Sequence, residues 1–104
     1  MIKIKVKYNG TFIKHFKVLG HANYDDYGKD IVCASVSSIV ICSVNMALKL
    51  DDKSVNTTSK EGFLEANILK QEDAINKVFV NMIDMLKELE NDYSKNIKIY
   101  EDRR

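Results

Sequence analysis

The chain has 104 residues, of which 45% are hydrophobic and 30% charged, as expected for one globular domain spanning residues 1–104. The formal net charge of +1 argues against a nucleic-acid-binding domain, for which a clear excess of basic residues is expected. The N-terminus lacks the apolar core of a signal peptide, and polar residues interrupt the most apolar run, residues 31–50. We therefore expect a cytoplasmic protein with reduced thiols and no membrane span.

Residues 2–8 alternate apolar and basic side chains, which predicts a half-buried strand. Asn9-Gly10 is typical of a tight hairpin turn, so residues 11–19 are predicted to form the partner strand. On this strand Phe12, Phe16 and Val18 share one face, and Ile13 falls on the other.

Two helices are predicted. The first runs from Ile31 to about Leu50 with Asp30 as its N-cap, and it is apolar around most of its circumference. Such a helix packs on more than one side, and a dimer interface is one way to cover it. The second runs from about Gln71 to Asn91, and its apolar stripe comprises Ile75, Val78, Phe79, Met82, Ile83, Leu86 and Leu89.

Residues 63–69 and 96–101 read as further strands, and residues 51–60 as a polar connection with room for a short strand. The predicted fold class is α+β, in the order β-β-α-β-α-β, with two helices packed against a mainly antiparallel sheet.

Cys33 is the candidate for chemistry. If Asp30 caps the helix, Cys33 lies in the first turn, where unpaired N–H groups and the helix dipole favour the thiolate. His21 could complete a Cys-His pair, and the N–H groups of Cys33 and Ala34 could form an oxyanion hole. The residues alone leave a second interpretation open, a small apolar side chain in the core. Cys42 has neither feature and is assigned to the core.

No metal or cofactor is predicted, because the two cysteines and two histidines have no ligand spacing. His15 is interpreted as structural or exposed. A redox role is the weakest alternative, because Cys33 and Cys42 are nine residues apart on one helix and too distant for a disulfide.

The segment around Cys33 reads Gly20-His21-Ala22, Tyr24, Tyr27-Gly28-Lys29-Asp30-Ile31-Val32-Cys33-Ala34 and Val36-Ser37. It resembles the signature of the ribosomal-processing cysteine protease family, Prp, and the likeness extends over nearly the whole chain. Asn23 stands where a glycine is common, and Ser35 where alanine is usual.

The resemblance implies a homodimeric endopeptidase that removes an N-terminal extension from a large-subunit ribosomal protein precursor, cutting beside an aromatic pair. It assigns Cys33 as nucleophile and His21 as general base, and it implies a loop that closes over substrate. That lid is expected at residues 22–29, with Ala22, Tyr24, Tyr27 and Gly28 meeting substrate.

Four assignments stay open. Asp30 either orients His21 or only caps the helix, and Ser37 either lines the substrate pocket or packs as a small residue. Tyr24 and Tyr27 either meet the substrate or pin the loop. The row Lys3, Lys5 and Lys7, with Lys14 and Lys17 nearby, either guides a precursor or ribosomal RNA or is a solvated face. The alternative function is a non-enzymatic, ribosome-associated dimeric module.

Overall fold

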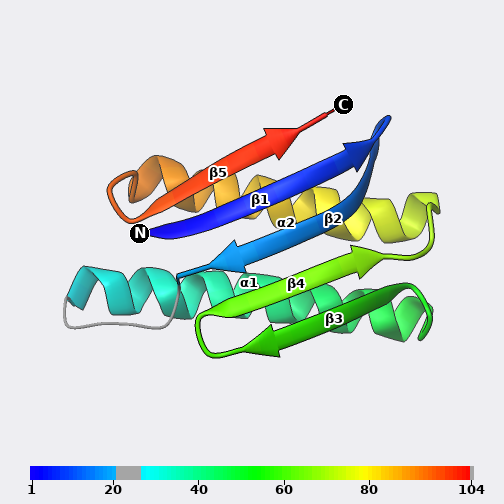
Figure 1. Ribbon diagram of the computed structural model, residues 1–104, viewed down its shortest axis with the longest axis horizontal. Coiled ribbons are helices and arrows are strands. Elements are labelled where there is room, and N and C mark those ends of the chain that lie inside the picture. Colours follow the sequence, from blue (N-terminus) through cyan, green and yellow to red (C-terminus); the bar gives the residue numbers. More distant parts are fainter. Residues whose placement is uncertain (21–26, 104) are drawn as a thin grey trace.

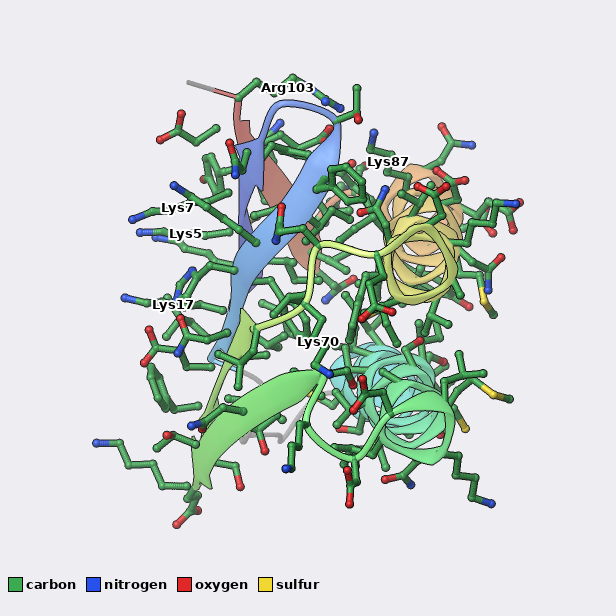
Figure 2. All side chains as sticks on the ribbon, turned by 90° about the vertical axis from the view of Figure 1, so that its right-hand side faces the viewer. Lys5, Lys7, Lys17, Lys70, Lys87 and Arg103 are labelled. Atoms are coloured by element: carbon green, nitrogen blue, oxygen red, sulfur yellow. The ribbon has the colours of Figure 1, made fainter. Side chains whose placement is uncertain are left out.

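The computed structural model describes residues 1–20 and 27–103, and the side chains of residues 27–30 lie outside that description. Two helices cover one face of a five-stranded sheet whose strand order is β3-β4-β2-β1-β5 (Figures 1 and 2). The elements in chain order are β1 (Ile2–Asn9), β2 (Phe12–Leu19), α1 (Tyr27–Leu50), β3 (Val55–Lys60), β4 (Phe63–Ile68), α2 (Asp73–Asp92) and β5 (Ile97–Asp102). The predicted α+β class, with two helices against a mainly antiparallel sheet, is confirmed.

The first hairpin forms as predicted, with Gly10 at a φ of +62° in its turn. A bulge shifts the register, so that Lys7 faces His15 and Tyr8 faces Ile13. The bulge places Ile13 on the buried face with Phe16 and Val18, which corrects the expectation that Ile13 falls on the other face. The Ile13 N–H donates to the side-chain Oδ1 of Asn76 in α2 at 2.9 Å.

The predicted polar connection contains a further strand, β3, which pairs antiparallel with β4. Only Val55 of this edge strand is buried, so it carries no apolar alternation that would have revealed it. β4 pairs antiparallel with β2, while β5 returns beside β1 as the one parallel pair among the described strands.

Helix α1 lies against the sheet through Val32, Val36 and Val40, which are buried. The segment Ile31–Leu50 has a mean hydropathy of 2.1 and is long and apolar enough, by composition, to cross a bilayer. The judgement that its polar residues exclude such a span was therefore too strict. Its packing on the sheet accounts for the apolar character, because the core helix of a globular protein has the same composition.

Helix α2 begins at Asp73, two residues later than predicted, with Glu72 in the N-cap position. The predicted stripe lies in the core, where Ile75, Phe79, Met82, Ile83 and Leu86 are buried. Val78 and Leu89 lie at its partly buried margin. The Phe79 ring meets that of Phe16 from β2, with centroids 5.6 Å apart, and so joins helix to sheet.

Candidate active site

Cys33 is the seventh residue of α1, because the helix begins at Tyr27 and not after Asp30. The prediction of Asp30 as N-cap was therefore wrong: residues 27–29 continue the helix by a further turn. The N–H groups of Cys33 and Ala34 lie inside the helix, where such groups donate to carbonyls four residues earlier. They are not free to form the predicted oxyanion hole, and the field of the helix end fades within the first turn.

The two cysteines occupy different surroundings. Cys33 is half-buried and packs against the hydrophobic core, whereas Cys42 is exposed. Nine residues of helix separate them by roughly 13 Å of rise and half a turn of rotation. Cys42 was assigned to the core from sequence, and that assignment was wrong. It lines a groove between α1 and α2 instead.

Gly20 fixes where the chain leaves β2 toward His21. Its φ is +81°, and its N–H donates to the Gly62 carbonyl at 2.9 Å. A Cβ at this position would stand 2.9 Å from the Met1 carbonyl oxygen. Glycine is therefore required here both by conformation and by space.

The predicted residues His21, Ala22 and Tyr24 lie outside the described part of the chain. For Tyr27, Gly28 and Asp30 only the backbone is described, and it belongs to the first turn of α1. Residues 27–29, which were expected to be part of the lid, belong to α1 instead. Figure 1 shows that β2 ends at the same side of the molecule where α1 begins.

Ser37 follows Cys33 by one helical turn on the same side of α1. It lines a small cavity of about 50 Å³ between α1 and the sheet, together with Val18, Val36, Val40, Ile41 and Leu64. Ser37 thus borders an apolar space one helical turn from Cys33. Its contact with a substrate stays a prediction.

A polar cluster ties β5 to β1 and α2. The Tyr8 hydroxyl donates to Glu101 Oε2, and Lys87 Nζ lies 2.8 Å from Glu101 Oε1. Burial, reinforced by the bond to Glu101, raises the pKa of Tyr8 to about 12. Burial opposes the charge of Glu101, but the bonds from Lys87 and Tyr8 outweigh it and lower the Glu101 pKa. Within the part of the chain described, no three His, Cys, Asp or Glu residues group as a metal site.

Comparison with known proteins identifies the chain. A family model described as cysteine protease Prp matches residues 1–98. The chain belongs to the cysteine protease Prp family. It is therefore a cysteine peptidase, and the alternative of a non-enzymatic module is not retained.

Two curated relatives named ribosomal processing cysteine protease Prp support this membership. The one from Staphylococcus aureus (strain Mu50 / ATCC 700699) is 30% identical over 83 residues, covering 77% of this chain and 78% of the relative. The Prp of Bacillus subtilis (strain 168) is 28% identical over 94 residues, covering 84% of each.

Solved structures share the fold. The Streptococcus mutans protein SMU.848 superposes with a TM-score of 0.94 at 21% identity, covering 100% of this chain and 96% of that one. S. aureus Prp in complex with a substrate peptide superposes with a TM-score of 0.91 at 24% identity, covering 98% of this chain and 100% of that one. The same protein with a covalently linked product peptide gives 0.88.

Sequence reasoning missed the role of Gly20 as the fixed exit from β2. The signal was the Gly-His dipeptide at a strand end, but the approach of Met1 is a tertiary contact that no local pattern shows.

Proposed function

We propose that this Prp-family peptidase removes the N-terminal extension of a bacterial large-subunit ribosomal protein precursor, cutting beside an aromatic pair. The observation that carries the proposal is the family match over residues 1–98, which includes the segment from Gly20 to Ser37. The names of the curated relatives, ribosomal processing cysteine proteases, support the substrate class. The site of action is the cytoplasm.

In the proposed mechanism, Cys33 Sγ attacks the scissile carbonyl carbon after His21 has taken the thiol proton. The peptide C–N bond breaks as His21 gives that proton to the leaving amine, and a thioester remains on Cys33. Water, deprotonated by His21, then releases the acid and the free thiol. Oxyanion donors other than the N–H groups of Cys33 and Ala34 are required, because those two lie inside α1.

Cys33, and not Cys42, fits the role of nucleophile. Cys33 lies on α1 close to its beginning, at the side of the molecule where β2 ends and the chain continues into His21 (Figure 1). Cys42 lies half a turn around the helix and farther along it, so that one histidine cannot serve both thiols.

The test is cleavage of a peptide carrying the aromatic-pair extension, followed by mass spectrometry. We expect one cut for the wild type and Cys42→Ala, and at least a thousandfold loss for Cys33→Ala and His21→Ala. Cleavage that survives Cys33→Ala would overturn the proposal.

Alkylation gives an independent test, because solvent exposure and thiol activation predict opposite orders of labelling for the two cysteines. By exposure alone, Cys42 reacts with iodoacetamide before the half-buried Cys33. An activated thiolate reverses the order, so we expect Cys33 to be labelled first at pH 6.5. Preferential labelling of Cys42 would count against a Cys-His pair, and His21→Ala should restore the order set by exposure.

We further propose a homodimer formed through the outer face of α1 and α2. No charged residue occurs between Ile31 and Leu48, yet Met46 of α1 is 52% exposed and Met85 of α2 is 43% exposed. Both line a groove of about 370 Å³, together with Ser38, Ile39, Cys42, Ser43, Val78 and Asn81. A second copy would cover this surface.

Light scattering after gel filtration tests the dimer. We expect a dimer for the wild type and a monomer for Met46→Glu. The matched control is Leu69→Glu, which places the same charge at an exposed leucine outside the groove. Equal masses for both variants would reject this interface.

A further inference from the structure

The sheet has a second face, opposite the helices, and no described element covers it (Figure 2). We call it the open sheet face. Strand register and alternation place these side chains on it: Lys3, Lys5, Lys7, His15, Lys17, Leu19, Asn56, Thr58, Lys60, Phe63, Glu65, Asn67, Lys98, Tyr100 and Asp102. Lys5, Lys7 and Lys17 point away from the helices in Figure 2.

The open sheet face is strongly basic. It carries six lysines and only two carboxylates, a formal charge of +4, whereas the whole chain carries +1. The remainder of the molecule is correspondingly acidic. The near-neutral total, which argued against a nucleic-acid-binding domain, therefore conceals a separation of charge between the two sides.

These lysines are poorly neutralised. Glu65 pairs with His15, whose Nε2 lies 2.6 Å from Glu65 Oε2. The same oxygen lies 4.0 Å from the Lys17 Nζ. Within the described residues, Lys3, Lys5 and Lys98 form no ion pair.

Register brings like charges together. Lys5 faces Lys17 on β2, and Lys3 faces Lys98 on β5. Like charges directly opposite one another destabilise a sheet. A face that only needed solvation would be served by mixed charges, so this arrangement points to a polyanionic partner.

Two aromatic side chains lie among the lysines. Tyr100 is 45% exposed and is the register neighbour of Lys5. Phe63 lies opposite Lys60, whose Nζ stands 5.4 Å from the ring centroid. β1 and β2 separate the two rings, a spacing of roughly 14 Å across the sheet. Aromatic rings on a flat basic sheet offer stacking positions for unpaired bases.

We propose that the open sheet face binds single-stranded RNA. Lys3, Lys5 and Lys98 contact phosphates, and bases stack on Tyr100 and Phe63. Neither a helix nor a described loop projects from this face to enter a duplex groove, which favours a single strand. The polar row of Asn56, Thr58 and Asn67 offers partners for ribose 2′-hydroxyl groups. This surface lies across the sheet from α1, and the inference does not depend on the proposed peptidase reaction.

Fluorescence anisotropy with a labelled 12-nucleotide RNA of mixed sequence, at 50 to 300 mM KCl, tests the proposal. Each lost phosphate contact reduces the slope of log K against log salt by about 0.7. The triple variant Lys3→Gln, Lys5→Gln, Lys98→Gln should therefore flatten the slope by about 2 and weaken binding at least tenfold at 100 mM. Lys5→Gln alone should flatten it by about 0.7, which keeps the test valid if the triple variant does not fold.

The matched control removes the same charge elsewhere, at the exposed residues Lys49, Lys77 and Lys95. This Lys→Gln triple should bind within twofold of the wild type. Tyr100→Leu should weaken binding about tenfold with the slope unchanged, because stacking carries no counterion release.

Competitors distinguish RNA from other polyanions. We expect single-stranded DNA of the same sequence to bind more weakly, and duplex DNA and heparin to be insensitive to Tyr100→Leu. Two results would overturn the proposal, because each would mean that RNA binds only by general charge attraction. One is equal weakening of binding by the two triple Lys→Gln variants, and the other is an unchanged affinity in Tyr100→Leu.

Discussion

Gly20 and Gly10 form a natural pair for testing how the exit from β2 supports the active site. Both have positive φ, +81° and +62°, so replacing either with alanine places a side chain in a left-handed conformation. That conformation costs roughly 1–2 kcal/mol. Alanine also lowers the conformational entropy of the unfolded chain, which offsets part of this cost. Gly10 has nothing within 4 Å of an added Cβ, so Gly10→Ala should lower the free energy of unfolding by about 1 kcal/mol.

Gly20→Ala adds a steric conflict to the same conformational cost. The new Cβ would lie 2.9 Å from the Met1 carbonyl oxygen. Met1 cannot retreat freely, because the next residue, Ile2, donates its N–H to the Asn96 carbonyl at 2.8 Å. Forced contacts of this kind cost typically 1–3 kcal/mol. We therefore expect Gly20→Ala to lose about 3 kcal/mol, some 2 kcal/mol more than Gly10→Ala.

Urea unfolding followed by circular dichroism measures both losses. Cleavage of the extension peptide, at a temperature where both variants are fully folded, then separates stability from positioning. We expect kcat/KM to fall at least tenfold for Gly20→Ala, since His21 follows it directly, and to stay within twofold for Gly10→Ala. Equal destabilisation of the two variants, or full activity of Gly20→Ala, would refute this reasoning.

Three further predictions concern stability. Ser54 is fully buried and donates its Oγ to the Ala47 carbonyl near the end of α1 at 2.9 Å, so Ser54→Ala should cost about 1–2 kcal/mol in urea unfolding. Phe79→Ala removes a fully buried ring that contacts Phe16 and should cost about 4 kcal/mol in the same assay; a loss below 1 kcal/mol would contradict the packing. Because the folded pKa of Tyr8 is raised to about 12 from 10.0, its stabilising contribution is present below pH 10 and is lost as pH rises toward 12. Absorbance at 295 nm should show a late tyrosine step near pH 12 that Tyr8→Phe removes.

The sequence predicts those parts of the fold that local patterns specify. Asn9-Gly10 located the first hairpin, and the apolar stripe from Ile75 to Leu86 located α2 with its buried face. β3 was not predicted with certainty because an edge strand with one buried residue has no apolar alternation. The bulge that buries Ile13 depends on pairing with β1 and on Asn76 from α2, both distant in sequence.

The candidate site likewise combines features that local sequence patterns predict with features that depend on the folded structure. The spacing of His21 and Cys33 within a recognisable motif indicated the family, which the comparisons confirmed. The beginning of α1 was placed too late because Asp30 is a favourable cap by residue type, whereas the helix starts at Tyr27. That difference removes the helix-end explanation for a reactive Cys33. Under the proposed function, His21 must therefore account for the reactivity of the thiol. The row of Lys3, Lys5 and Lys7 with Lys17 was noted from the sequence, with ribosomal RNA as one alternative partner. Lys60 and Lys98 were not connected with that row, because the lysines come from four strands and meet only in the folded sheet.

The parallel pairing of β5 with β1 has a consequence for how the protein is made. β1 is complete at residue 9, but its second neighbour begins only at residue 97, so the sheet closes only after the residues of β5 have been synthesised. Loop closure over this separation comes late in folding, after local hairpins have formed. Until then one edge of β1 stays open to pairing with other chains. A nascent chain therefore cannot assemble the finished sheet while its last strand is still inside the ribosome, and a stop codon before residue 97 would yield an aggregation-prone product.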